Sequence, residues 1–165
     1  MKRSAAALLL LLASAGPAAA TVGDTTAATV SMTVNPNCIV SATNLAFGSY
    51  NPLSPSPTDG ASTLQIRCTY LTVWSIKLNQ GTGSGATISQ RRMTRTASPP
   101  SGTLTYSLYT DAARIVLWGD GLTGVSAVGS GTGSWQTVNV YGRIPTGQFT
   151  AAGSYSDTIS VTVNY

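Results

Sequence analysis

The feature of this sequence that most restricts its fold is an alternation of apolar and polar residues that recurs along the chain. A two-residue period puts the apolar side chains on one face of a β-strand, and no segment shows convincing 3.6-residue helical periodicity. The clearest segments have apolar residues at Leu64, Ile66 and Cys68; Trp74, Ile76 and Leu78; Leu104, Tyr106 and Leu108; Val138 and Val140; and Ile159, Val161, Val163 and Tyr165.

Segments rich in glycine, serine and proline separate these alternating segments. Such residues favour turns, because they tolerate or fix the backbone conformations that turns require. We predict turns over residues 51–60, 81–85, 98–102, 119–133 and 145–153. Short strands separated by turns predict an all-β domain, either a sandwich or a barrel.

The N-terminus has the pattern of a secretory signal peptide. A positively charged start precedes an uncharged apolar run over residues 5–13 and the small residues 18–20. A transmembrane helix is the alternative, but it needs about 20 apolar residues, and this run ends by Gly16. We predict that residues 1–20 are removed on export and that the mature chain, which begins near Thr21, has no transmembrane span.

The charge of the chain argues against a nucleic-acid partner. Charged residues make up 8% of the sequence, compared with about 25% in an average soluble domain. Loss of Lys2 and Arg3 lowers the formal net charge from +4 to +2. The remaining basic residues are spread between Arg67 and Arg143 and form no dense basic stripe, which a nucleic-acid-binding protein would carry.

Cys38 and Cys68 are the only cysteines, and the sequence contains no histidine. In an exported chain an even number of cysteines indicates a disulfide, whereas two free thiols are the less favoured alternative. Two thiols without histidine supply too few ligands for a zinc site. We therefore predict a structural disulfide between Cys38 and Cys68.

Catalysis is disfavoured by the residues that are missing. Without histidine or glutamate there is no Ser-His-Asp triad, and a glycosidase pair would need two of the five aspartates. We predict that the chain is not an enzyme and has no metal or cofactor, and that the aspartates bond to nearby backbone in turns. They are Asp24, Asp59, Asp111, Asp120 and Asp157.

Trp118-Gly119-Asp120-Gly121 is the best candidate for a sugar or calcium site, because an exposed indole suits a sugar and a carboxylate suits calcium. One carboxylate cannot provide the about six to eight oxygen ligands of calcium, so we favour a tight turn.

Three further side-chain assignments follow from local patterns. Trp74 is predicted to lie in the core because it alternates with other apolar residues. Arg91, Arg92 and Arg95 are predicted to lie on a solvated strand edge, where charges discourage misplaced pairing. Tyr155 is a candidate for a corner hydrogen bond to the backbone.

A further alternating segment precedes the first cysteine. Its apolar face consists of Ala28, Val30, Met32 and Val34, and its polar face of Thr29, Ser31 and Thr33. From alternation alone, an ordinary first strand of the sandwich is an open alternative. However, Pro36 follows and cannot donate a ladder hydrogen bond. The last alternating segment reaches Tyr165, and we expect its edge to be left uncovered, which suggests exchange of strands between copies.

An ordered set of motifs resembles the spore coat protein U domain, which also forms the pilins of archaic, Csu-type chaperone-usher pili. The resemblance covers about residues 36–165. The motifs are Phe47-Gly48-Ser49-Tyr50, Ile66-Arg67-Cys68-Thr69, Arg92-Met93, Leu104-Thr105-Tyr106-Ser107-Leu108-Tyr109-Thr110-Asp111, Trp118-Gly119-Asp120-Gly121, Val140-Tyr141-Gly142-Arg143-Ile144, and Gly153-Ser154-Tyr155-Ser156-Asp157-Thr158-Ile159 through Tyr165.

The resemblance implies an incomplete immunoglobulin-like β-sandwich that lacks its last strand. Residues 21–35 would be an N-terminal extension whose Ala28–Val34 segment is donated to another copy, and residues 36–165 the pilin domain. The acceptor groove would be bordered by the last strand, with Ile159, Val161, Val163 and Tyr165. A periplasmic chaperone would fill the groove until an outer-membrane usher exchanges its strand for the extension of the next subunit.

The function implied is therefore that of a structural subunit of a cell-surface pilus, secreted through the periplasm and used for adhesion and biofilm formation. Two alternatives stay open. One is a secreted structural protein of the spore-coat type that does not polymerise. The other is a carbohydrate-binding module or adhesin.

Overall fold

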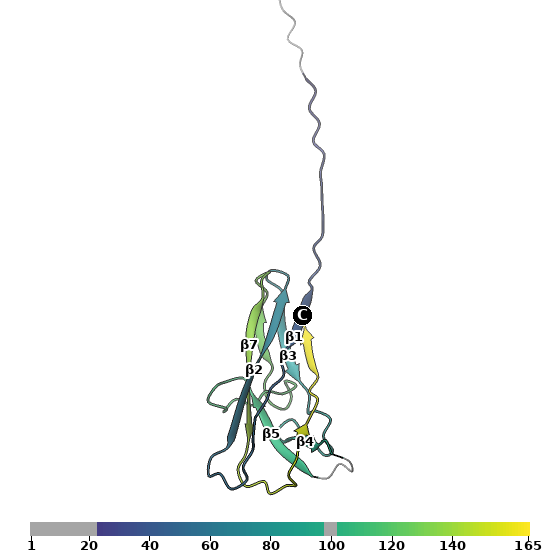
Figure 1. Ribbon diagram of the computed structural model, residues 1–165. Helices are drawn as coiled ribbons and strands as arrows, with labels where there is room; N and C mark the ends of the chain where they lie inside the picture. The colour runs from purple at the N-terminus through teal and green to yellow at the C-terminus, as the bar shows by residue number, and fades with distance from the viewer. Residues whose placement is uncertain (1–22, 98–101) are drawn as a thin grey trace, which may run out of the picture. The chain divides into compact units, whose positions relative to one another are not determined.

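The computed structural model describes residues 23–97 and 102–165. The chain divides into two units, Met1–Thr33 and Val34–Tyr165. Residues 23–33 of the first unit contain no helix or strand, and their side chains are exposed. The second unit carries all the strands drawn in Figure 1. The signal peptide predicted at residues 1–20 lies outside the described residues.

The described residues form nine β-strands and no helix, which confirms the all-β prediction. The strands are β1 (Cys38–Ala42), β2 (Thr58–Cys68), β3 (Val73–Leu78), β4 (Arg91–Arg95), β5 (Thr103–Tyr109), β6 (Ala127–Ser130), β7 (Gln136–Ile144), β8 (Tyr155–Ser156) and β9 (Val161–Asn164).

These strands form two antiparallel sheets. The larger sheet has six strands in the order β1-β2-β7-β5-β4-β8, and the smaller has three in the order β6-β3-β9. Strand β1 therefore lies at one edge of the large sheet, and β9 at one edge of the small sheet. The longest pairing joins β2 to β7, from Thr58 opposite Ile144 to Ile66 opposite Gln136.

A single core receives side chains from both sheets. The apolar residues that the alternation singled out in β2, β3 and β5 are all buried, and so is Val140 of β7. Trp74 is 5% exposed, as predicted for a core residue. The alternation was informative here because one face of each strand is buried and the other solvated.

Two predicted turns contain strands instead. Strand β2 begins at Thr58, within the segment 51–60, because β7 is long enough to pair with it. Strand β6 lies within the segment 119–133. Its Gly129 looks like a turn residue, but a side chain there would collide with the ring of Trp74. Glycine is thus required by close packing inside a strand.

The prediction that the arginines of β4 lie on a solvated edge is wrong for Arg91. Strand β4 is paired on both sides, with β5 and with β8. Arg91 is fully buried, and burial lowers the pKa of its guanidinium. The guanidinium donates hydrogen bonds to the backbone carbonyls of Asn79, Ile88 and Trp118 at 2.9–3.0 Å, which offset its loss of hydration.

Cys38 and Cys68 form the predicted disulfide, with sulfur atoms 2.04 Å apart. The two residues lie directly opposite each other on β1 and β2. The bridge therefore fixes the start of β1, an edge strand, to the end of β2, its neighbour in the large sheet. Such bridges are typical of exported proteins, because they form in oxidising compartments.

We predict that replacing both cysteines by serine lowers the free energy of unfolding by about 2–5 kcal/mol, because the unfolded chain gains the freedom that the bridge removes. Urea denaturation of the purified protein measures this. Treatment of the wild-type protein with a reductant under denaturing conditions is the control and should give the same shift. An unchanged midpoint in both samples would contradict a stabilising role.

Candidate functional site

The inward face of β1 is incompletely covered. Val40 lies directly opposite Ile66, so both side chains are on the same face of the sheet. Ile66 is fully buried, whereas Val40 is 37% exposed. Ala42, opposite the buried Leu64, is also exposed. The inner face of the large sheet is therefore open to solvent along this edge.

The edge strand β9 has the same property in the small sheet. Val161 lies opposite Leu78, and Val163 lies opposite Ile76. Leu78 and Ile76 are buried, but Val161 and Val163 are only half-buried, although they face the same core. Among the described residues β9 pairs with β3 alone, so its other edge is unpaired.

An open hollow lies between these two edges. It has a volume of about 450 Å³ and is bounded by the inner faces of both sheets. Polar and apolar atoms contribute about equally to its walls, and several of its apolar side chains are half-buried, which is the exposure expected of a core that lacks a covering element. The apolar residues that line it include Leu45, Phe47, Leu64, Leu78, Met93, Tyr106, Leu108, Val140, Ile159 and Val161.

A second hollow, of about 790 Å³, adjoins the first and shares Leu45, Phe47, Met93 and Tyr155 with it. It is bounded by residues 45–52 and by the connection that follows β7. We refer to the two hollows together as the groove. The motif Phe47-Gly48-Ser49-Tyr50 lines it, a role that the sequence alone did not reveal.

A pair of glycines allows one wall of the groove to pack closely against the large sheet. Gly60 of β2 and Gly142 of β7 are directly opposite each other. A Cβ atom on Gly142 would lie 2.6 Å from the Phe47 ring, and one on Gly60 would lie 3.0 Å from Leu45. The Phe47 ring also contacts Tyr106 edge-to-face, with 5.9 Å between ring centroids. The glycine pair thus lets the segment after β1 lie against the large sheet.

We predict that Gly142→Ala lowers the free energy of unfolding by about 1–3 kcal/mol, because the added methyl group displaces Phe47. Urea denaturation is the measurement. Gly23→Ala is the matched control, since a Cβ atom at Gly23 meets nothing within 4 Å. Equal midpoints for the two variants would show that Phe47 is not held at this position.

Asp157 fixes the opposite wall of the groove, between β8 and β9. Its carboxylate accepts hydrogen bonds from the Tyr106 hydroxyl at 2.7 Å, and from the backbone and hydroxyl of Thr82 at 2.8 and 2.9 Å. Burial, reinforced by the bond to Asp157, raises the pKa of Tyr106. The predicted bond to nearby backbone is present, from the N–H of Thr158 at 2.8 Å. The bonds from Tyr106 and Thr82, which reach across the fold, were not predicted.

Tyr155 makes the predicted corner hydrogen bond. Its hydroxyl donates to the backbone carbonyl of Ala151 at 2.5 Å and lies 2.9 Å from the Thr150 hydroxyl. The bond fixes the connection before β8, which also lines the groove. The role of Tyr155 is therefore structural.

The turn assignment of Trp118-Gly119-Asp120-Gly121 is confirmed. One oxygen of Asp120 accepts hydrogen bonds from the backbone of Leu122 and Thr123 at 2.9 and 2.7 Å. Trp118 is fully buried, and its indole donates to the carbonyl of Ile76 at 3.0 Å. The exposed indole that a sugar site would use is absent at this position.

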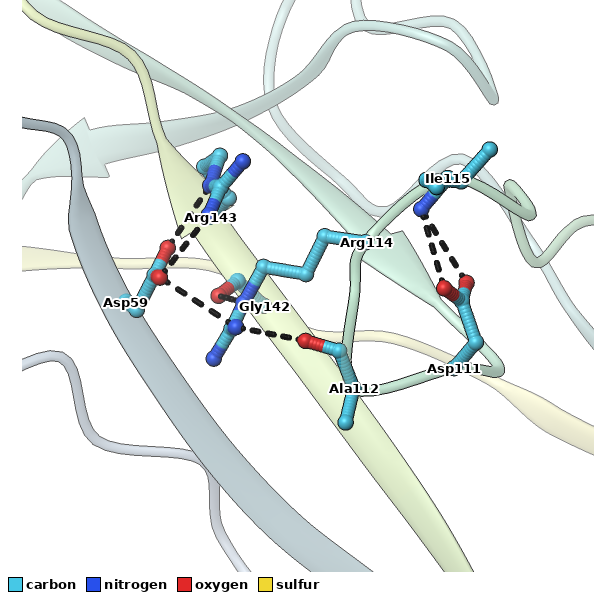
Figure 2. A network of polar contacts seen from close by, with 7 residues as sticks. All are labelled: Asp59, Asp111, Ala112, Arg114, Ile115, Gly142 and Arg143. Carbon is cyan, nitrogen blue, oxygen red and sulfur yellow. Dashed lines mark hydrogen bonds and ion pairs between the residues drawn. The ribbon is translucent and has the colours of Figure 1, made fainter.

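A polar network holds the outer face of β2 and β7 (Figure 2). Asp59 forms ion pairs with Arg143 at 2.8 Å and with Arg114 at 3.2 Å. Its hydrogen bond to Arg143 lowers the pKa of the Asp59 carboxyl below its ordinary value. Arg114 also donates to the carbonyls of Gly142 and Ala112. The predicted turn role of Asp59 was wrong, because the carboxylate clamps two strands to the loop after β5.

Because the pKa of Asp59 is lowered in the folded state, its contribution to stability is present above its unfolded pKa and is lost as pH falls. We predict that Asp59→Asn costs about 0.5–1 kcal/mol at pH 7 and that the difference from wild type shrinks between about pH 5 and pH 2. Urea denaturation as a function of pH measures this, with Asp24→Asn as the control. A difference that is independent of pH would contradict the ion-pair account.

The structure places the other predicted site residues as follows. Ile159 and Val161 line the groove, Val163 packs against the core, and Tyr165 lies beyond β9 and is 57% exposed. In the extension, Val30 is 95% and Met32 85% exposed. Residues 23–37 contain no strand.

Within the described residues, no three His, Cys, Asp or Glu side chains cluster closely enough to hold a metal ion. The same residues include no helix of the length and hydropathy needed to cross a membrane. The candidate site consists of the groove together with the edge strands β1 and β9.

Comparison with known proteins identifies the class. Residues 24–162 match the model of the Spore Coat Protein U domain. The chain is 36% identical over 130 residues to Protein U of Myxococcus xanthus, covering 73% of this chain and 71% of that protein.

A solved structure has a similar fold. It is a chain of the CsuC-CsuE chaperone-tip adhesion subunit pre-assembly complex from the archaic chaperone-usher Csu pili of Acinetobacter baumannii. The TM-score is 0.59 at 24% sequence identity, with 81% of this chain and 41% of that chain covered.

These observations define a structural β-domain and not an enzyme. The chain belongs to the Spore Coat Protein U domain family.

Proposed function

We propose that this protein is a structural subunit of an archaic chaperone-usher pilus, which polymerises by donor-strand exchange and serves adhesion and biofilm formation. In this proposal the domain is an immunoglobulin-like sandwich without its last strand. The Ala28–Val34 segment of another copy supplies that strand by lying in the groove. The observation that carries the proposal is the groove between the free edges of β1 and β9.

The groove suits an added β-strand in two respects. An edge strand presents unpaired backbone groups that can form a ladder with another chain. The half-buried side chains of Val161, Phe47 and Met93 offer apolar surface for alternate side chains of that chain. Recognition by strand addition draws affinity from the ladder and specificity from such pockets.

The Ala28–Val34 segment has the properties of such a strand. Its seven residues would span about 23 Å when extended. Val30, Met32 and Val34 are 66–95% exposed, and they would share one face of an extended strand. Burial of each would contribute about 1.5–3 kcal/mol, before the backbone ladder is counted. Assembly would thus be driven by burial that the isolated subunit does not achieve, without ATP or a cofactor.

The partners follow from the same groove. A secreted domain with partly exposed core residues and two free strand edges is prone to aggregate. We therefore infer a periplasmic chaperone that fills the groove before assembly, and an outer-membrane usher at which its strand is exchanged for the extension of the next subunit.

The proposal predicts that Val30→Asp or Met32→Asp abolishes fibres, because each buries an unpaired carboxylate in the groove. Ser31→Asp and Thr33→Asp are matched controls, since they place the same charge on the opposite face of the strand. Electron microscopy of cells that express the subunit with its chaperone and usher is the measurement. Chaperone-bound subunit should be recovered equally from all four variants.

Normal fibres from both Val30→Asp and Met32→Asp would refute the donor assignment. Loss of fibres in the Ser31→Asp and Thr33→Asp controls as well would show that charge on either face is harmful, which the strand-in-groove arrangement does not predict.

A second candidate is a secreted structural protein of the spore-coat type that does not polymerise. The 36% identity to Protein U favours it. Size-exclusion chromatography of the mature chain distinguishes the two functions. A stable, soluble monomer in the absence of a chaperone supports the coat-type function, whereas chaperone-dependent recovery supports the pilus subunit.

A further inference from the structure

Four exposed apolar residues lie on segments that are hydrogen-bonded to one another near Asn37, where the N-terminal extension joins the domain. Tyr70, Leu71, Val73 and Trp135 are 51–72% exposed. The backbone beneath them is well held, because Leu71 and Gly131 are joined by a hydrogen bond of 2.8 Å. We call these four residues the root collar.

The root collar is not explained by the domain's own packing. Leu71 has a positive φ of 62°, which is unfavourable for a bulky side chain. Its side chain is nevertheless apolar and 68% exposed. Strained backbone that presents an exposed apolar side chain is typical of a surface that binds a partner.

The extension leaves the domain beside this collar. Asn37 is anchored by three hydrogen bonds to Thr69: its backbone N–H donates to the Thr69 hydroxyl at 3.1 Å, and its carbonyl accepts from the backbone N–H and the hydroxyl of Thr69 at 2.9 and 3.3 Å. Val34 and Cys38 are separated by three residues, so their Cα atoms lie at most about 14 Å apart. A copy whose groove holds Val34 must therefore be close to the collar of the copy that donates it.

The direction of the donated strand decides which end of the receiving copy lies close to the root collar of the donor. Strand β9 runs toward the collar, since Asn164 pairs with Ser75 near the start of β3. A strand parallel to β9 would leave the groove at the receiving copy's own collar, where that copy's Asn37 is already anchored. An antiparallel strand leaves at the opposite end and avoids this conflict.

Two exposed apolar residues border the groove at that opposite end. Leu53 is 78% and Phe149 75% exposed. The segments that carry them are joined through the Tyr50 hydroxyl, which donates to the Pro145 carbonyl and accepts from the Gln148 N–H, both at 2.9 Å. We call Leu53 and Phe149 the far rim.

We propose that the root collar of each subunit packs against the far rim of the subunit that receives its strand. This inference rests on the proposed donor-strand exchange and adds a second contact, between domain ends, to it. The contact is heterologous and head-to-tail, so it repeats along an open fibre and does not close a dimer. It would limit the freedom of the three-residue linker and so stiffen the fibre.

Cysteine cross-linking tests this contact in assembled fibres. The variant with Leu71→Cys and Phe149→Cys should give, after mild oxidation and boiling without reductant, a ladder of covalent multimers that reductant removes. Leu71→Cys with Leu122→Cys is the matched control, because Leu122 is 96% exposed but lies in the turn beside β3. Tyr70→Cys with Leu53→Cys tests the same contact independently.

A ladder with either collar–rim pair, and none with the control, supports the contact. Intact fibres without a ladder in both collar–rim pairs overturn it and leave donor-strand exchange standing. Equal ladders in the control pair also overturn it, since the contact would then be unspecific. Absence of fibres from the wild-type protein would instead be a failure of the proposed function.

Discussion

Incomplete coverage of the apolar core is the constraint on which the rest of this structure depends. Both sheets contribute to one core, but the edge strands β1 and β9 carry core-facing residues that remain partly exposed. Val40 and Val161 show this most clearly, because each lies opposite a residue that is buried. An added strand would cover these residues, and the burial of their apolar surface would favour its binding.

A disulfide and a set of hydrogen bonds, and not a closing strand, hold the two walls of the groove. The Cys38–Cys68 bridge fixes β1 to β2. On the other side, the carboxylate of Asp157 joins the segment before β9 to Tyr106 and Thr82. These interactions fix the two walls of the groove in the isolated domain, and a preformed groove reduces the ordering cost of binding a strand.

Much of the fold was predictable because its strands bury one face only. Alternation identified the inward residues of β2, β3 and β5, and the cysteine count gave the disulfide. Strand β6 was missed because its glycine serves close packing against Trp74 and not a turn. The burial of Arg91 was missed because its partners are backbone carbonyls from distant segments, which leave no pattern in the sequence. The same holds for Asp157 in the groove wall.

The most direct measurement is a cryo-electron microscopy map of fibres assembled from this chain. The account predicts continuous density for Ala28–Val34 of one subunit between β1 and β9 of its neighbour, with Val30 and Met32 pointing into the neighbour's core. Density that pairs this segment with strands of its own domain, or a neighbour's groove without an added strand beside β9, would contradict it.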